Sequence, residues 1–238
     1  MEDEPDKLNR FEAAFERGQE GEISNFEVWL QENGIDPDKA NTEYLKQYFR
    51  DNPERAVNHE EELEDVAEYI GFFSRRSNVY HLPVVGVSGI GKTQFLQTVS
   101  NLLGQVEPSI EQRSYEADKF SEIGEDEERV FEIRDELRDL DKAVVYVDDC
   151  EWEQAESLIE SFRVIESVVD DALLLTAWTP EYWKDYAEDV EAALPSSTEI
   201  HLSPFSESET VEALKRIFEI VSDDGFELSE AFLKQIHE

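Results

Sequence analysis

A run of ten residues, VVGVSGIGKT at positions 84–93, combines three glycines with a lysine and a threonine. Its spacing matches G-x-x-x-x-G-K-[ST], and it lies between an apolar run and a helically spaced one. Glycines let the backbone curl so that successive N–H groups point inward, and a following helix directs its positive N-terminal end toward an anion. The alternative is a turn that only packs a strand on a helix, but such a turn needs no Lys-Thr pair. We therefore expect a phosphate site made by Gly86, Ser88, Gly89, Ile90, Gly91, Lys92, Thr93 and Gln94.

Two side chains of this loop predict the ligand. Lys92 has the position of a lysine that reaches the β and γ phosphates of a nucleotide, and Thr93 that of a hydroxyl that ligates Mg²⁺. The guanine-reading pattern Asn-Lys-x-Asp does not follow in the sequence, which favours adenine. We therefore expect ATP or ADP, together with Mg²⁺, as cofactors.

Two adjacent carboxylates follow a second apolar run, in KAVVYVDDCEW at 142–152. A continuous apolar run is typical of a buried parallel strand, and the carboxyl ends of such strands open on the ligand crevice. We expect Asp148 to hold Mg²⁺ through water and Asp149 to polarise the attacking water, with Glu151 as a rival for this base role. The alternative for the Asp-Asp pair is a helix cap or a turn.

A third run, DALLLTAWTP at 171–180, places a threonine where the strand is expected to end. A hydroxyl at that place can hydrogen-bond the γ-phosphate or the attacking water, so it would distinguish ATP from ADP. We expect Thr176 to have this sensor role. Thr179 competes for it, and an ordinary strand-terminating threonine is the alternative.

Alternating elements are expected to position these groups. We predict strands at 82–87, near 113–117, at 143–147, 172–176 and 198–202, and helices at 91–103, 127–140, 152–168, 180–193 (several short ones), 208–221 and 228–237. Strands separated by helices indicate a parallel sheet covered by helices on both faces. The predicted fold class is therefore α/β, with the parallel sheet of P-loop NTPases.

The first 52 residues differ from this pattern. Aromatic residues recur at helical spacing at 8–18, 24–34 and 41–53, and each stretch ends at a glycine or proline. We interpret 1–52 as an N-terminal helical region, either packed on the main domain or acting as a separate interaction module. The core would span 53–205, opening with a helix capped by Asn58, and 206–238 would begin a helical lid.

The chain is strongly acidic, with 59 Asp and Glu against 21 Lys and Arg and a formal charge of −38. Because 39% of residues are hydrophobic and 11% aromatic, we expect a packed interior rather than disorder. Such a surface is best screened by molar salt, where the Debye length is about 3 Å, so we expect the salt-rich cytoplasm of a halophile. The charge disfavours nucleic acid and anionic membranes, although a halophilic surface leaves nucleic acid open.

Cysteine and histidine usage excludes some classes of site. Cys150 is the only cysteine, so the chain can form no internal disulfide and no all-cysteine zinc site. Its four histidines lack metal-binding spacing. The sequence has neither a signal-peptide pattern at its start nor an apolar stretch of about 18 residues, so we expect a cytoplasmic protein.

The order and spacing of four motifs resemble the STAND class of signalling NTPases, including NB-ARC-like proteins, and the related AAA+ ATPases with the archaeal origin-recognition initiators. The motifs are VVGVSGIGKT, VVYVDDCEW, LLLTAWTP and EIHLSPFSESETVEAL, and the resemblance covers about residues 55–238. The loop GVSGIGKT looks like the Gly-Ile-Gly-Lys-Thr loop of STAND proteins, and DDCEW resembles their Asp-Asp-x-Trp ending, so both favour STAND. The resemblance implies a slow ATPase that acts as a nucleotide-dependent switch in signalling, defence or regulation.

The resemblance also extends to the expected base site. AVNHEEEL at 56–63 resembles the Val-Gly-Arg-Glu-x-Glu-Leu entry of these families, so the backbone near Val57 would frame adenine, although Asn58 and His59 replace Gly and Arg. Pro204, in the Pro-Phe turn before the lid, would face the nucleotide. The rest of the lid is expected beyond Glu238.

Two departures limit the expected rate and leave the role open. Ala177 and Trp178 replace the second threonine and the arginine of the usual Thr-Thr-Arg strand, and no arginine lies between Arg163 and Arg216. Because an arginine finger contributes roughly 10³ to 10⁵ in rate, the chain alone should hydrolyse ATP slowly. Two alternatives are a replication initiator and a nucleotide-stabilised interaction module. A protein partner or self-association is expected in either the switch or the module.

Overall fold

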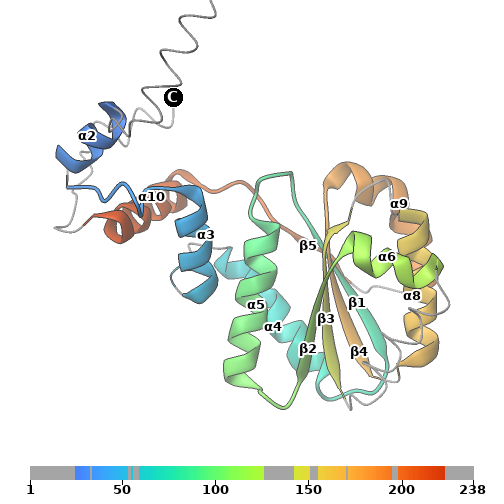
Figure 1. Cartoon of the computed structure of the whole chain (residues 1–238). Helices are drawn as coiled ribbons and strands as arrows, with labels where there is room; N and C mark the ends of the chain where they lie inside the picture. The colour runs from blue at the N-terminus through green and yellow to red at the C-terminus, as the bar shows by residue number, and fades with distance from the viewer. Residues whose placement is uncertain are drawn as a thin grey trace, which may run out of the picture. The chain divides into compact units, whose positions relative to one another are not determined.

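The computed structural model describes residues 25–32, 34–52, 55, 59–125, 142–150, 155–169, 171–194 and 198–222. The chain divides into two compact units (Figure 1). The larger unit spans Tyr48–Thr210, and the smaller one combines Met1–Gln47 with Val211–Glu238. Within the described ranges, no helix is long and apolar enough to cross a membrane.

The larger unit is built on a five-stranded sheet in the order β2-β3-β4-β1-β5. All its strand pairs are parallel. The strands are β1 (Val79–Val85), β2 (Glu111–Glu116), β3 (Ala143–Cys150), β4 (Ala172–Trp178) and β5 (Ile200–His201). The predicted α/β class with a parallel sheet is therefore confirmed.

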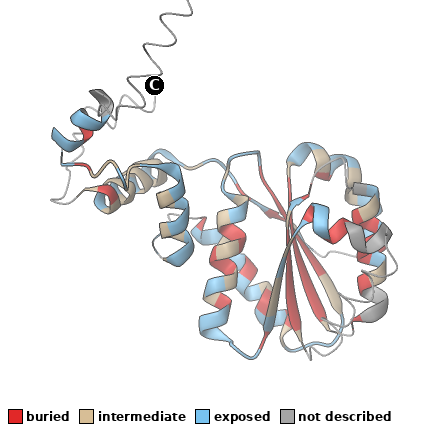
Figure 2. Ribbon diagram, in the orientation of Figure 1, coloured by how far each residue is buried: buried red, intermediate tan, exposed pale blue. Residues whose placement is uncertain are grey.

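Helices cover both faces of this sheet (Figure 1). They are α4 (Glu60–Phe73) and α5 (Lys92–Val106) on one face, and α6 (Ala117–Glu125), α8 (Ala155–Val168) and α9 (Pro180–Ala193) on the other. Strand residues alternate between the two cores: Val144 and Tyr146 pack with α4 and α5, whereas Val145 and Val147 pack with α6, α8 and α9. The central strands are consequently buried on both sides (Figure 2).

Several predicted boundaries differ from the structure. Strand β3 continues through Asp148 and Asp149 to Cys150, and β4 continues two residues beyond Thr176. Residues 180–193 form one helix rather than several, and α6 was not predicted. Helix α4 has His59 at its N-cap, one residue after the predicted Asn58. The helices predicted at 8–18, 127–140 and 228–237 lie outside the described residues.

The smaller unit brings together two segments that are far apart in the sequence. It contains α2 (Asn25–Glu32), the first part of α3 (Thr42–Asp51) and most of α10 (Glu207–Val221). Leu30, Ile35 and Val221 form a small core, and the Asp36 N–H donates to the Val221 carbonyl at 2.8 Å. The domain limits at 52/53 and 205/206 stay a prediction, because the unit joins residues from both terminal regions.

Helix α10 begins with a capping box. The Glu209 N–H donates to Ser206 Oγ at 3.3 Å, and the Ser206 N–H and Oγ–H donate to Glu209 Oε2 at 2.7 Å and 2.6 Å. These bonds satisfy backbone donors that the first helical turn leaves without partners, and they lower the pKa of Glu209. The cap fixes where the chain turns from β5 into α10.

Candidate functional site

The glycine-rich loop joins the end of β1 to the start of α5 at the carboxyl edge of the sheet. Gly89 and Gly91 have φ angles of 80° and 101°, in the left-handed region that strains residues with a Cβ atom. Gly91 is also the N-cap of α5. These two glycines therefore let the chain curl immediately before the helix, as the predicted phosphate cradle requires.

Gly86 lies at the base of the loop, close to the end of β4 and to the segment after β5. Its N–H donates to the Trp178 carbonyl at the end of β4, at 3.0 Å. A Cβ atom built on Gly86 would lie 2.8 Å from Ile90 Cγ2 and 3.1 Å from Leu202 Cβ. A glycine is needed here because the loop and the segment after β5 leave no room for a side chain.

The side chain of Lys92 folds back over the loop. Its ammonium group donates to the carbonyl oxygens of Gly86 at 2.8 Å and Val87 at 3.2 Å. The cation is thus held inside the curl of the loop, where a phosphate group would meet it. Gln94, also predicted to bind the nucleotide, donates through its side-chain amide to the Phe49 carbonyl at 3.4 Å. Ser88 and Thr93 are exposed, and Ile90 is half-buried.

Thr93 and Asp148 line one cavity of about 500 Å³. Asp148 is half-buried near the end of β3, and Thr93 lies in the first turn of α5. A hydroxyl and a carboxylate facing one polar cavity are oxygen ligands of the kind that Mg²⁺ takes. The residues predicted to hold the metal are therefore brought together, although 55 positions separate them in the sequence.

Asp149 has a backbone conformation that the sequence did not predict. Its φ is 60°, and the register of β3 against β4 shifts between Val147 and Cys150. Asp148 and Asp149 therefore lie in a β-bulge. The Asp149 N–H donates to Asp148 Oδ1 at 2.9 Å. The bulge gives the two neighbouring carboxylates different surroundings, since Asp149 is exposed and Asp148 is half-buried.

Thr176, the predicted sensor, lies within β4 and is buried in the core. Its hydroxyl is fully buried, accepts a hydrogen bond from Trp178 Nε1 at 2.7 Å, and lies 2.7 Å from His81 Nε2. The His81 ring packs against Phe162 of α8 and Trp183 of α9, on the sheet face opposite α5. Thr176 is thus committed to the core, because β4 extends past it to Trp178. The position after the strand end is Thr179, the N-cap of α9.

The buried histidine beside Thr176 makes stability depend on pH. Burial lowers the pKa of His81 from 6.5 to about 3, so below pH 6.5 the unfolded chain binds a proton that the folded chain does not. Between pH 7 and pH 5 this one group should lower the free energy of unfolding by about 2 kcal/mol. Chemical denaturation of the wild type and of His81→Phe at both pH values measures it. Equal losses in the two proteins would contradict the prediction.

Three rings form an aromatic cluster at the start of α4: those of His59, Phe95 and Phe205. The ring of His59 lies 5.3 Å from that of Phe205, in the Pro-Phe turn, and 6.1 Å from that of Phe95, in α5. His59 is 4% exposed, yet within the part of the chain that the structure describes its Nε2 has no hydrogen-bond partner. Pro204, which precedes Phe205 in the sequence, is exposed. Val57 lies outside the described residues.

The sequence analysis missed two cations that line the cavity of Thr93 and Asp148. They are Arg50, in the last turn of α3, and Lys119, in the first turn of α6. No sequence motif contains either residue. Only the pairing of β2 with β3 brings the segment around Lys119 to Asp148.

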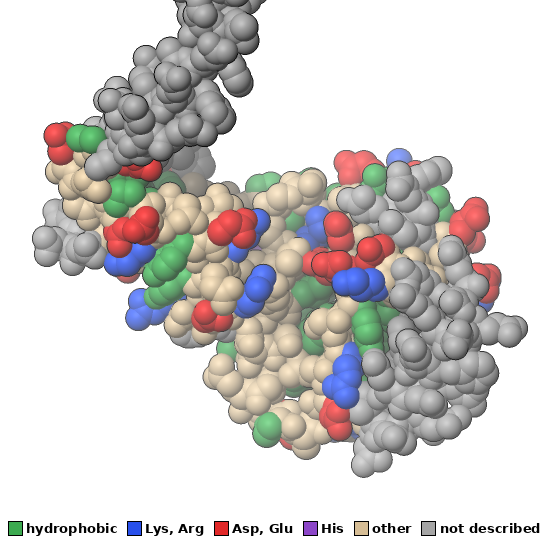
Figure 3. Space-filling model, viewed as in Figure 1, with side chains coloured by type: hydrophobic (Ala, Val, Ile, Leu, Met, Phe, Trp, Pro, Cys, Tyr) green, Lys and Arg blue, Asp and Glu red, His purple; other side chains and the backbone are tan. Residues whose placement is uncertain are grey.

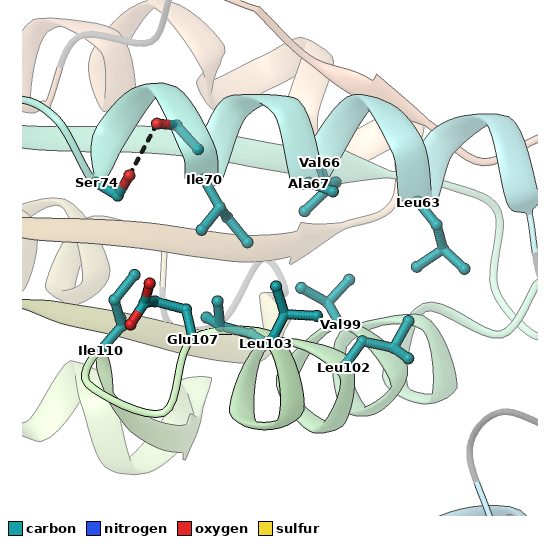
Figure 4. Close-up of a pocket in the computed structure, with 12 residues that line it drawn as sticks. Leu63, Val66, Ala67, Ile70, Ser74, Val99, Leu102, Leu103, Glu107 and Ile110 are labelled. Carbon is teal, nitrogen blue, oxygen red and sulfur yellow. Dashed lines mark hydrogen bonds between the residues drawn. The ribbon is translucent and has the colours of Figure 1, made fainter.

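A second cavity, of about 250 Å³, lies between α4 and α5 and is mainly apolar (Figure 4). Its walls include Leu63, Val66, Ile70, Val99, Leu102 and Leu103. Its polar side chains are Ser74, which donates to the Gly71 carbonyl at 2.9 Å, and Glu107. This lining suits apolar contacts rather than phosphate binding.

A methyl group added in this second cavity should stabilise the fold. Gly71 lies within α4, and a Cβ atom there would meet no atom within 4 Å. Gly71→Ala should raise the free energy of unfolding by about 0.5–1 kcal/mol, because alanine favours helix and restricts the unfolded chain. Gly86→Ala is the contrasting variant, since its Cβ would collide with Ile90 and Leu202. Denaturation of both variants tests this, and a loss of stability in Gly71→Ala would contradict it.

Comparisons with known proteins bear on the fold. No protein-family model matches the sequence, and none of the curated proteins matches it significantly. Domain III of the replication initiation protein DnaA from Thermotoga maritima is 18% identical, with a TM-score of 0.54, over 78% of this chain and 79% of that one. Cdc6p from Pyrobaculum aerophilum is 15% identical, with a TM-score of 0.56, over 74% of this chain and 53% of that one.

A third solved structure is the Orc1 protein of Aeropyrum pernix in complex with DNA, 16% identical, with a TM-score of 0.53, over 70% of this chain and 50% of that one. The chain thus spans about half the length of the Cdc6p and Orc1 chains that it matches. At these identities the similarity describes the fold alone. The chain has an α/β fold with a parallel sheet, similar to that of DnaA domain III and of Cdc6p.

Proposed function

We propose that this chain binds ATP or ADP with Mg²⁺, hydrolyses ATP slowly, and works as a nucleotide-dependent conformational switch of the STAND or AAA+ type. One observation carries the proposal. The left-handed glycines Gly89 and Gly91 lead directly into a helix whose first turn shares a polar cavity with Asp148. A loop that curls before a helix N-terminus binds phosphate, and the shared cavity supplies the oxygen ligands for its metal.

Each residue of the site has a distinct part in binding. The N–H groups of the loop would receive the phosphates, and Lys92 would exchange its two carbonyl acceptors for phosphate oxygens. Thr93 and Asp148 would hold Mg²⁺, Asp148 through water. The metal would supply charge neutralisation at the phosphates. Asp149 would accept a proton from the attacking water.

The base end of the nucleotide would lie toward α4 and the Pro-Phe turn. Phe205 is half-buried in the Pro-Phe turn with its ring 5.3 Å from that of His59, and the buried His59 Nε2 has no hydrogen-bond partner among the described residues. A buried polar atom without a partner is unfavourable, so a hydrogen-bonding ligand would satisfy it. Val57 and Pro204 stay proposed contacts of the adenine, and Thr179 replaces Thr176 as the proposed sensor.

The switch proposal rests on how α10 is connected. The Pro-Phe turn leads directly into the capping box of α10, and this helix continues from the larger unit into the smaller one. A nucleotide that contacts the turn would therefore bias the helix that joins the units. ATP and ADP would favour different arrangements, and a protein partner or a second copy would recognise one of them.

Nucleotide binding by the folded chain is the test. Calorimetry with ATP and with ADP, in Mg²⁺ and about 2 M KCl to screen the acidic surface, should show one site for each nucleotide. Light scattering and a protease-sensitivity assay with each nucleotide would then report assembly and rearrangement. If the folded chain binds neither nucleotide, the proposal is wrong.

A replication initiator is the second candidate function. The observation that favours it is the similarity to DnaA, Cdc6p and Orc1, of which the first is a replication initiation protein and the third is solved with DNA. On the face drawn in Figure 3, cationic side chains stand singly among acidic ones, which does not favour a phosphate backbone. Fluorescence anisotropy with duplex DNA in ATP, over a range of salt, distinguishes the two functions.

A further inference from the structure

The cavity that contains Thr93 and Asp148 extends toward β2 and α6, and its lining includes a cation whose place was not predicted. We propose that Lys119 contacts the γ-phosphate of bound ATP and is a catalytic residue that this chain itself supplies. This inference rests on the proposed ATP-binding function and assigns a residue within it. It addresses the arginine that the sequence lacks between Arg163 and Arg216.

The sheet places Lys119 beside the metal-binding carboxylate. Strands β2 and β3 run parallel, and the last residue of β2, Glu116, is paired with Asp148. Helix α6 begins at the next residue, so Lys119 lies in its first turn. The Lys119 ammonium group is 3.7 Å from Glu116 Oε2, which places the cation at the end of the strand that adjoins Asp148.

The surroundings of Lys119 allow it to change partners. Its side chain is 65% exposed and that of Glu116 is 70% exposed, so their ion pair is weak and solvated. A γ-phosphate in the cavity carries more charge than one carboxylate and would compete for the ammonium group. Lys119 would therefore leave Glu116 when ATP arrives and return when the γ-phosphate is gone.

The other cation of the cavity is a weaker candidate. Arg50 comes from the last turn of α3, which is joined to α5 through the hydrogen bond from Gln94 to Phe49. The segment that carries Lys119, in contrast, continues directly from the strand paired with Asp148. Of the two cations, Lys119 therefore has the more direct backbone connection to Asp148, the proposed metal ligand.

The reaction step shows what the cation does. The water oxygen forms a bond to the γ-phosphorus, and the bond from that phosphorus to the β,γ-bridging oxygen breaks, its electron pair staying on ADP. The proton of the water goes to Asp149, so the products are ADP, inorganic phosphate and a proton. Negative charge on the transferred oxygens would be stabilised by the ammonium group of Lys119, once the γ-phosphate has drawn it from Glu116.

The experiment compares nucleotide discrimination and turnover in Lys119→Ala, Lys119→Arg and Arg50→Ala, with Lys184→Ala as the control. Lys184 is exposed on α9 and belongs to no part of the site. Calorimetry gives the dissociation constants for ATP and ADP, and phosphate release gives turnover. We expect Lys119→Ala to weaken ATP by about tenfold relative to ADP and to slow turnover by about 100-fold. Lys119→Arg should recover most of both, and Lys184→Ala should match the wild type.

Each alternative result has a separate meaning. If the wild type binds ATP and Lys119→Ala keeps its ratio of ATP to ADP affinity and its turnover, this inference is wrong while the proposed function stands. If Arg50→Ala alone shows the expected losses, Arg50 is the cation and Lys119 is not. If the folded wild type binds neither nucleotide, both this inference and the proposed function fail.

Discussion

Replacing Lys92 with alanine should weaken the binding of ATP by at least about 100-fold and leave the fold intact. In the structure the ammonium group lies within the loop, 2.8 Å from the Gly86 carbonyl oxygen, so its removal takes away a side-chain cation from the proposed phosphate site. Charge-assisted bonds to phosphate are about twice as strong as neutral ones, and several would be lost together. Calorimetry of wild type and Lys92→Ala with ATP and Mg²⁺ measures the loss.

The control for Lys92→Ala must distinguish the loss of contacts to ATP from a change in the conformation of the loop. Lys92 also donates to the Val87 carbonyl, so the variant loses contacts within the loop itself. Denaturation should show a free energy of unfolding within about 1 kcal/mol of the wild type, because the loop glycines and the first turn of α5 keep their backbone bonds. Lys184→Ala, on the exposed face of α9, should bind ATP normally. ATP binding by Lys92→Ala as tight as that by the wild type would exclude the loop as the phosphate site.

The backbone of the site could be predicted from the sequence because it depends on local rules. Gly89 and Gly91 occupy left-handed positions that glycine favours, and the apolar run 143–147 is buried on both faces as a central parallel strand. Order along the chain then places Thr93 and Asp148 at the same edge of the sheet, and they share a cavity. The loop and the strand could each be predicted because each depends on the types of residues within that one segment.

The end of β4 shows why Thr176 was expected at the edge of the sheet. Apolar residues continue past Thr176 through Ala177 and Trp178, and nothing in their types marks where pairing with β1 and β3 stops. The strand end is fixed by tertiary contacts, including the bond from the Gly86 N–H to the Trp178 carbonyl. An error of two residues keeps a side chain on the same face of the sheet but moves it from the edge into the core.

Lys119 was missed for a different reason. It belongs to no motif. Its position near Asp148 depends on the pairing of β2, which ends at Glu116, with β3, which begins at Ala143. Residues 126–141 between them are outside the described ranges. Contacts that only strand pairing creates cannot be predicted from local spacing.

Asp149→Asn should keep ATP binding within about threefold of the wild type and slow hydrolysis by about 10² to 10⁴. Asparagine has the same size but cannot accept the proton of the attacking water at neutral pH. The substitution suits the backbone, because Asp149 has a φ of 60° and asparagine tolerates the left-handed region well. Phosphate release and calorimetry on one preparation separate the two effects.

Asp148→Asn is the matched comparison, since the two carboxylates are neighbours with different surroundings. Asp148 is half-buried in the cavity with Thr93, so its loss should weaken binding of ATP in Mg²⁺ more than binding of ATP without the metal. Asp149 is exposed at the bulge, so its loss should leave that dependence on Mg²⁺ unchanged. If Asp149→Asn hydrolyses ATP at the wild-type rate, the base is another group, with Glu151 the next to replace. If the two variants lose Mg²⁺-dependent binding alike, the bulge does not divide the carboxylates into a ligand and a base.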